Sequence, residues 1–143
     1  MSADLLHTRV EEMASIAFER LRELVQIESP SFNVEASRHI TDVLAEWFTA
    51  VGGAVQRVTT SAGVHLVIHV PGRDAKGAEA HDELPVLLIG HSDTVWPLGT
   101  LAGNVPWVVD GDVMKGPGVY DMKSGLIIML TALEVLRDQP RRP

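Results

Sequence analysis

The stretch Leu84-Pro85-Val86-Leu87-Leu88-Ile89 runs directly into Gly90-His91-Ser92-Asp93-Thr94, and it decides the expected fold. Its first part is apolar on both faces, which is typical of a central strand covered by helices on both sides. A strand of this kind predicts an α/β domain. The polar residues that follow lie where open α/β sheets carry their functional groups, beyond the carboxyl end of a strand.

Helical periodicity on either side of this strand predicts the covering layers. Thr8-Arg9-Val10-Glu11 has the form of a capping box, which predicts a first helix over about residues 9–27. A second periodic segment predicts a helix that ends near Val51, before Gly52-Gly53. A third helix, over about residues 123–137, is apolar nearly all round and therefore suits a position against a sheet.

Short β segments complete the pattern. Residues 55–60 and 64–70 are rich in β-branched side chains and predict a hairpin. Residues 107–115 contain an Asp-Gly turn and predict a second, shorter hairpin, whereas the polar residues 71–83 predict a surface loop. The alternation of helices and strands indicates a three-layer α/β/α sandwich with a mixed sheet, and we expect this chain to hold only an incomplete part of it.

The composition excludes several classes of function. Of the 143 residues 45% are apolar, which is enough for the core of one domain. Twelve lysines and arginines against nineteen acidic residues give a net charge of −7, so nucleic acid is not an expected partner. Cysteine is absent, so a metal site must use histidine and carboxylates. The sequence shows no secretory signal and no apolar run of the roughly 20 residues that span a bilayer, which predicts a cytoplasmic protein without a membrane partner.

His91 and Asp93 form the first candidate site. In an extended chain their side chains point to the same side, about 6.6 Å apart. Asp93 can then accept a hydrogen bond from one ring nitrogen of His91 while the other nitrogen binds a metal. An isolated His-x-Asp is more often a histidine that ends a strand and an aspartate that begins a turn. This motif alone leaves both interpretations open.

The second candidate site is the segment Gly116-Pro117-Gly118-Val119-Tyr120-Asp121-Met122-Lys123, in which a tight glycine turn places Asp121 at the entrance of the third helix. A dinucleotide-binding loop is the obvious competitor. Asp121 stands where that loop has its third glycine, and its charge would repel a pyrophosphate, so a cation is the better ligand. Taken alone, Asp121 can also be a simple helix N-cap.

Together the two segments resemble the signatures of a known family, the co-catalytic zinc metallopeptidases and deacylases. This family includes glutamate carboxypeptidase, aminoacylase, acetylornithine deacetylase and succinyl-diaminopimelate desuccinylase. Gly90–Val95 represents the first signature and Gly116–Gly125 the second, in the expected order and about thirty residues apart. The similarity covers nearly the whole chain, and residues His91–Pro97 and Tyr120–Lys123 look closest to the glutamate carboxypeptidase branch.

The resemblance implies a zinc-dependent hydrolase of amide or peptide bonds that acts on N-acyl amino acids or small peptides. A complete site of this family holds two Zn²⁺ ions, and other divalent metals such as Co²⁺ can replace them. By the resemblance, His91 binds one zinc, Asp121 bridges both, and Asp93 is the catalytic residue that orients His91. The family also implies a cis peptide bond between Asp121 and Met122.

The resemblance further implies that residues 1–143 are the N-terminal portion of a catalytic domain. Its remainder and a lid or dimerisation domain are expected outside this chain. The family places a Glu-Glu pair some tens of residues after the bridging aspartate, whereas Glu11-Glu12 lies in the first turn of the first helix, where it suits the positive helix end and solvent. We therefore expect the general base and the other metal ligands to be absent, the chain alone to be inactive, and a homodimer only for the full-length parent.

Two other functions stay open at this point. One is an acetyl or succinyl deacylase of amino-acid biosynthesis, which would use the same three residues. The other is a non-catalytic binding or regulatory remnant. The remaining histidines suggest no further metal site, since His65 and His69 lie about 13 Å apart along a strand, too far to chelate one ion.

Overall fold

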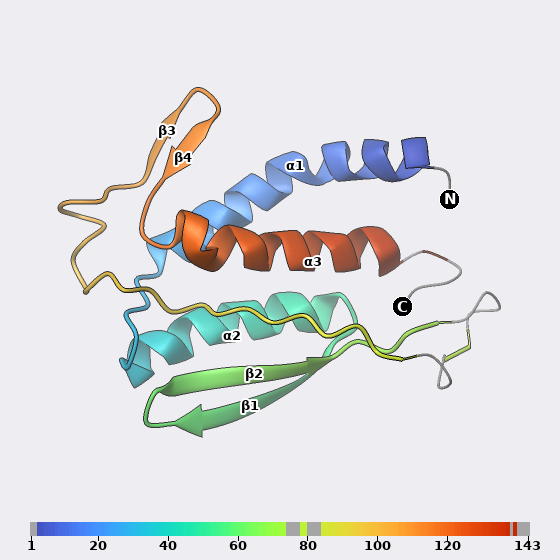
Figure 1. The fold of residues 1–143 in the computed structure, drawn as a ribbon, viewed down its shortest axis with the longest axis horizontal. Helices are drawn as coiled ribbons and strands as arrows, with labels where there is room; N and C mark the ends of the chain where they lie inside the picture. Colours follow the sequence, from blue (N-terminus) through green and yellow to red (C-terminus); the bar gives the residue numbers. More distant parts are fainter. Residues whose placement is uncertain (1–2, 74–77, 80–83, 138, 140–143) are drawn as a thin grey trace.

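The structure, a computed structural model, describes residues 3–73, 78–79, 84–137 and 139. Within these residues the chain forms three α-helices, a kinked π-helical turn and two antiparallel hairpins (Figure 1). In chain order the elements are α1 (Ala3–Gln26), α2 (Val34–Ala50), β1 (Ala54–Thr60), β2 (Gly63–His69), β3 (Val108–Asp110), β4 (Val113–Lys115), η1 (Val119–Lys123) and α3 (Ser124–Arg137). This combination is compatible with part of an α/β domain.

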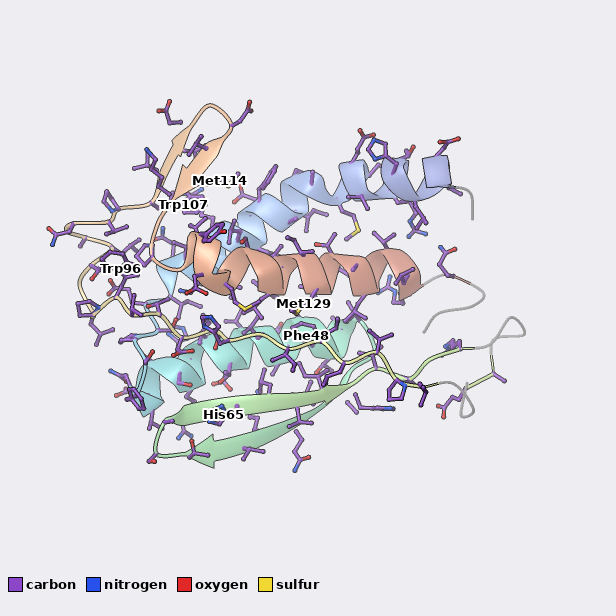
Figure 2. The ribbon with its side chains drawn as sticks, in the orientation of Figure 1. Phe48, His65, Trp96, Trp107, Met114 and Met129 are labelled. Atoms are coloured by element: carbon purple, nitrogen blue, oxygen red, sulfur yellow. The ribbon has the colours of Figure 1, made fainter. Side chains whose placement is uncertain are left out.

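The hydrophobic core lies between the three helices. In Figure 1 α3 runs between α1 and α2, and its apolar composition allows it to pack against both. Figure 2 shows Phe48 of α2 and Met129 of α3 in the layer between their helices. The buried core residues are Leu21, Leu24 and Val25 of α1, Ile40, Leu44 and Phe48 of α2, Val51 just after it, and Leu126, Ile127 and Leu130 of α3. Burial of such side chains contributes about 1.5–3 kcal/mol each, which fixes the start of α3 and the turn before it.

Most of the elements expected from the sequence are confirmed to within one residue at each predicted end. Both hairpins are present, with β1 paired antiparallel to β2 and β3 paired antiparallel to β4. The second helix ends at Ala50, and the third covers Ser124–Arg137. The longer hairpin packs against α2, where Ser37 Oγ accepts a hydrogen bond from Val64 N at 2.9 Å. These elements depend on local patterns, which the sequence displays directly.

The start of the first helix differs from the prediction. α1 begins at Ala3, so the capping box assigned to Thr8–Glu11 is wrong. Thr8 lies inside the helix, where its Oγ1 donates to the carbonyl oxygen of Asp4 at 3.0 Å, a bond that hydroxyl groups often make within helices. Asp4 instead supplies the acidic group that suits the positive helix end. The apolar periodicity missed the first turns because they lie outside the core; Leu5, for example, is 52% exposed.

The central strand expected at residues 84–89 is not formed. This extended segment, yellow in Figure 1, crosses α2 in that view without pairing to a strand. Its apolar side chains are exposed on both faces, with Leu84 at 94% and Leu87 at 79%. A strand requires a neighbour for its backbone hydrogen bonds, and among the described residues β1 pairs with β2 alone and β3 with β4 alone. The apolar side chains of residues 84–89 fit a strand covered on both faces, but neither hairpin of the described residues pairs with this segment.

The polar loop predicted for residues 71–83 is described only in part. Arg73 and Glu79 form an isolated antiparallel bridge within it. Residues 74–77 and 80–83 lie outside the described residues. Among the helices that the structure describes, none is both long enough and apolar enough to cross a membrane.

Arg20 connects all three helices. Its two terminal nitrogens donate to the carboxylate of Glu134 on α3 at 2.6 and 2.9 Å, and its guanidinium lies 5.6 Å from the ring centroid of Trp47 on α2. The side chains of the ion pair are only 22% and 15% exposed, so water screens it weakly. We expect Arg20→Met to lower the free energy of unfolding by about 2 kcal/mol, because the partly buried carboxylate loses two charged hydrogen bonds.

Urea denaturation measures this difference, and Arg22→Met on the same helix is the matched control. Arg22 lies 3.9 Å from Glu19, and both side chains are exposed, so its loss is expected to change stability by less than about 0.5 kcal/mol. Equal effects of the two substitutions would contradict the role given to Arg20.

Candidate metal centre

The turn before α3 carries Asp121 to the site. Gly118 has a φ of 74°, in the left-handed region that glycine adopts most readily. A Cβ atom at Gly118 would lie 2.7 Å from Cγ2 of Thr94, so the turn approaches the segment 91–94 this closely only without a side chain. Asp121 has an extended backbone, with φ −124° and ψ 96°, and its peptide bond to Met122 is cis, as the family resemblance implied.

His91 lies between two carboxylates. Its Nε2 is 2.9 Å from Oδ1 of Asp121, and its Nδ1 is 3.3 Å from Oδ1 of Asp93 and 3.1 Å from the backbone oxygen of Asp93. Gly90 allows this approach, since a Cβ atom there would lie 2.9 Å from Cδ2 of Leu126 on α3. The structure therefore brings together His91, Asp93 and Asp121, the three residues selected from the sequence, although Asp121 follows His91 by thirty positions.

The two carboxylates alter the acid–base behaviour of His91. Partial burial alone lowers the pKa of the imidazole, because it disfavours the charged ring. The hydrogen bonds to Asp121 and to the backbone of Asp93, together with the charges of both aspartates, outweigh this effect and raise the pKa of His91 above its ordinary value. The surroundings of His91 thus favour a positive charge at the ring, which a protonated imidazole or a nearby cation can supply.

The facing atoms of His91 and Asp121 fit a metal ion. Zinc binds histidine nitrogen and carboxylate oxygen at about 2.0–2.2 Å in tetrahedral geometry, which places two such donors about 3.3 Å apart. The observed separation of 2.9 Å is close to this value, and the side chains are 45% and 76% exposed, so they can adjust without disturbing the core. No group of three or more histidine, cysteine or acidic side chains among the described residues is arranged to hold a metal.

A pocket of about 270 Å³ opens beside these residues. Trp96, labelled in Figure 2, belongs to its wall, on the loop that follows the segment 91–94. The polar side of the pocket includes His91, Asp93 and Asp121, and the apolar side includes Val95, Trp96 and Val119. A small ligand with both polar and apolar parts fits such a lining.

Comparison with known proteins is consistent with this site. Residues 87–143, which include His91 and Asp121, match the sequence model of the peptidase family M20/M25/M40. Carboxypeptidase G2 of Pseudomonas sp. (strain RS-16) is 32% identical to the chain over 122 residues. The chain belongs to the peptidase family M20/M25/M40. The matched region covers 82% of the chain but only 27% of Carboxypeptidase G2, so the chain spans about a quarter of the length of this relative. The resemblance to the glutamate carboxypeptidase branch is thereby supported.

Two serines of this M20 chain contact the site but were not selected from the sequence. Ser29 Oγ donates to the backbone oxygen of Ser92 at 2.7 Å, and Ser31 Oγ donates to Oδ2 of Asp93. Both serines follow α1, more than sixty positions before their partners. The only local signal was Pro30 between them, which indicates a helix boundary and says nothing about contacts with a distant segment.

Glu28 and Lys123 hold the surrounding segments in place. Glu28 accepts hydrogen bonds from the amides of Leu101 and Gly99 at 2.7 and 2.6 Å, and these bonds lower the pKa of its carboxyl group. Lys123 is fully buried, and its Nζ donates to the carbonyl oxygens of Leu24 and Ile27, both at 2.9 Å. In this M20 chain the end of α1 is therefore tied both to the loop after Trp96 and to the turn that carries Asp121.

Glu28→Gln is expected to lower the melting temperature at neutral pH, because a neutral amide accepts the two backbone hydrogen bonds less strongly than a carboxylate. The pKa of Glu28 is lower in the folded state than its ordinary value of 4.5. Its stabilising effect is therefore present above pH 4.5 and is lost as the pH falls through the folded-state pKa.

Thermal unfolding of both proteins across this pH range measures the effect. The gap between the melting temperatures of the wild-type protein and the Glu28→Gln variant is expected to narrow on acidification. A gap that stays constant from neutral pH to about pH 3 would show that the charge of Glu28 does not stabilise the loop.

Proposed function

We propose that this chain supplies the first metal ligands of a zinc-dependent carboxypeptidase or amidohydrolase that acts on N-acyl amino acids or small peptides. The observation that carries the proposal is the 2.9 Å approach of His91 Nε2 to Asp121 Oδ1, with Asp93 on the other ring nitrogen. Family membership and the relative Carboxypeptidase G2 support the reaction class. Within this proposal, residues 1–143 form the N-terminal portion of a three-layer α/β/α catalytic domain.

Each of the three residues has a distinct task in the proposed site. Nδ1 of His91 donates to the backbone oxygen of Asp93, with the Asp93 carboxylate 3.3 Å away, which leaves the lone pair of Nε2 facing Asp121 and the pocket. Asp121 adds a negative oxygen at the same point, so that a histidine nitrogen and a carboxylate oxygen converge on one position. This pair of donor types is common in zinc sites that have no cysteine.

The pocket lining is suited to an amide substrate. A bound zinc ion supplies Lewis-acid polarisation of a carbonyl oxygen and lowers the pKa of water. The apolar side chains Val95, Trp96 and Val119 lie on the other side of the pocket and can contact an acyl group or an apolar residue of a peptide. Since the relative is a carboxypeptidase and the similarity includes the segments around His91 and Asp121, we propose that the leaving group is an amino acid with a free carboxylate, such as glutamate.

The test begins by reading the coding sequence beyond residue 143 and producing any longer chain that it encodes. This product is assayed with zinc against N-acyl amino acids that differ only in the amino acid released. Best turnover of an N-acyl glutamate supports the proposed glutamate-releasing carboxypeptidase. Best turnover of acetylornithine indicates a biosynthetic deacylase instead, and no turnover of any member at saturating zinc overturns the proposal.

Residues 1–143 alone are expected to bind zinc weakly and to show no hydrolase activity. A catalytic zinc needs about three protein ligands, whereas His91 and Asp121 provide one donor each and the described residues contain no larger cluster. Calorimetric titration with Zn²⁺ measures the affinity, and an assay with an N-acyl glutamate measures turnover. Sub-micromolar affinity together with zinc-dependent turnover would contradict this expectation.

A further inference from the structure

The two carboxylate oxygens of Asp93 have different partners. Oδ1 lies 3.3 Å from Nδ1 of His91, whereas Oδ2 accepts a hydrogen bond from Oγ of Ser31. The last side-chain torsion of aspartate is broad, so a carboxylate held at one oxygen can rotate away from its partner. With both oxygens engaged, rotation of the carboxylate breaks the hydrogen bond to Ser31 or lengthens the ion-pair contact with His91. Ser31, Asp93, His91 and Asp121 thus form one continuous chain of polar contacts.

The backbone around Ser31 is itself fixed against the segment that contains Asp93. Ser31 N donates to the carbonyl oxygen of Thr94 at 3.0 Å, and Thr94 N donates to the carbonyl oxygen of Ser29 at 2.8 Å. These bonds form a short parallel bridge between Pro30 and Thr94. The bridge uses backbone atoms alone, so it does not need the Ser31 hydroxyl. The bridge holds that hydroxyl within reach of two acceptors, Oδ2 of Asp93 and, at the longer distance of 3.3 Å, the carbonyl oxygen of Thr94.

We propose that Ser31 is a positioning residue of the metal centre, which acts through Asp93 to fix the His91 ring toward the ion. This inference rests on the proposed function, because it concerns the orientation of a proposed metal ligand. Ser31 lines the same pocket as His91 and Asp121, but in the hydrogen bonds described above it bonds to neither, so its hydrogen-bonded route to the metal ligands runs through Asp93. A contribution that passes through one intermediate residue disappears when that residue is removed.

A double-mutant cycle on zinc affinity tests the proposal. In residues 1–143, Zn²⁺ binding is followed through the ring resonances of His91 by NMR. Ser31→Ala is expected to weaken binding about 10-fold, the lower end of the usual effect of a residue that supports a metal ligand, and Ser31→Thr is expected to restore it. In an Asp93→Ala background, Ser31→Ala is expected to cause no further loss.

Ser29→Ala is the matched control, because Ser29 lies on the same segment but its hydroxyl binds a backbone oxygen. Any effect of Ser29→Ala on zinc affinity is expected to be the same with and without Asp93. Additive effects of Ser31→Ala and Asp93→Ala would overturn the proposal, as would a failure of Ser31→Thr to restore affinity.

A second measurement keeps the proposal separate from the proposed function. In the metal-free protein, the Nδ1 resonance of His91 is expected to shift in Ser31→Ala and to stay in place in Ser31→Thr. If zinc does not bind at all, the proposed function fails, yet this resonance still reports whether Ser31 acts on His91 through Asp93. An unshifted resonance in Ser31→Ala would overturn the positioning role alone.

Discussion

Alanine in place of His91 or of Asp121 is expected to weaken zinc binding by more than about 100-fold, which exceeds the usual loss for a residue that only orients a ligand. Each substitution removes one of the two donors that face each other at 2.9 Å. The site then keeps a single direct donor in place of a converging pair, which moves it further from the roughly three protein ligands of a catalytic zinc. In any longer chain with hydrolase activity, the same substitutions are expected to remove nearly all turnover.

Calorimetric zinc titration measures this loss, and two comparisons make it specific. His65→Ala removes a histidine that bonds Thr60 on the distant hairpin, so zinc affinity is expected to stay unchanged. Asp93→Ala is expected to reduce the affinity by about 10–100-fold, less than the loss of a direct ligand. Unchanged zinc affinity in His91→Ala would remove the basis of the proposed metal centre.

The melting temperature separates a lost ligand from a lost fold. The side chains of His91 and Asp121 are 45% and 76% exposed, and neither belongs to the hydrophobic core. Substitutions at such positions usually change stability by less than about 0.5 kcal/mol. His91→Ala and Asp121→Ala are therefore expected to unfold at nearly the wild-type temperature, so that weaker zinc binding reflects the missing donor.

The sequence predicted most of the helices and hairpins well because the residue pattern of each one lies within its own short segment. Helices α2 and α3 and both hairpins follow from apolar spacing, β-branched residues and turn chemistry within short windows. Residues 84–89 show the limit of this reasoning. Their apolar side chains indicate what a strand would contact, but strand formation depends on backbone partners elsewhere, and the described residues place none beside them.

In the candidate site, too, the sequence predicted some contacts and missed others. The close approach of His91 and Asp121 was expected from two motifs in the right order. The supporting contacts of Ser31 and Lys123 were not expected. They join positions more than sixty residues apart, and neither serine nor lysine is a residue type that indicates such a contact. A lysine is seldom fully buried, so no sequence pattern indicated an interior position for Lys123.

Lys123→Met is expected to cause the largest loss of stability, about 3 kcal/mol. The carbonyl oxygens of Leu24 and Ile27 lie at the end of α1, where helices run short of amide donors, and both accept bonds from Lys123 Nζ at 2.9 Å; that of Leu24 also accepts from the amide of Ile27 at 3.3 Å. Methionine fills a similar volume but donates no hydrogen bond, and a hydrogen bond from a charged group contributes about 1.5–3 kcal/mol. Burial lowers the pKa of Lys123 to about 8, so relief from desolvation of its charge offsets part of this loss.

Urea denaturation of Lys123→Met and of Lys115→Met measures the difference, since Lys115 is an exposed lysine on β4. The Lys115 variant is expected to unfold within about 0.5 kcal/mol of wild type. Lys123 follows Asp121 by two positions and anchors the turn that carries it, so zinc affinity is expected to fall in the Lys123 variant as well and to stay unchanged in the Lys115 variant. Equal stability of the two variants would show that the end of α1 does not depend on Lys123, and the turn would then be held by the core contacts of α3 alone.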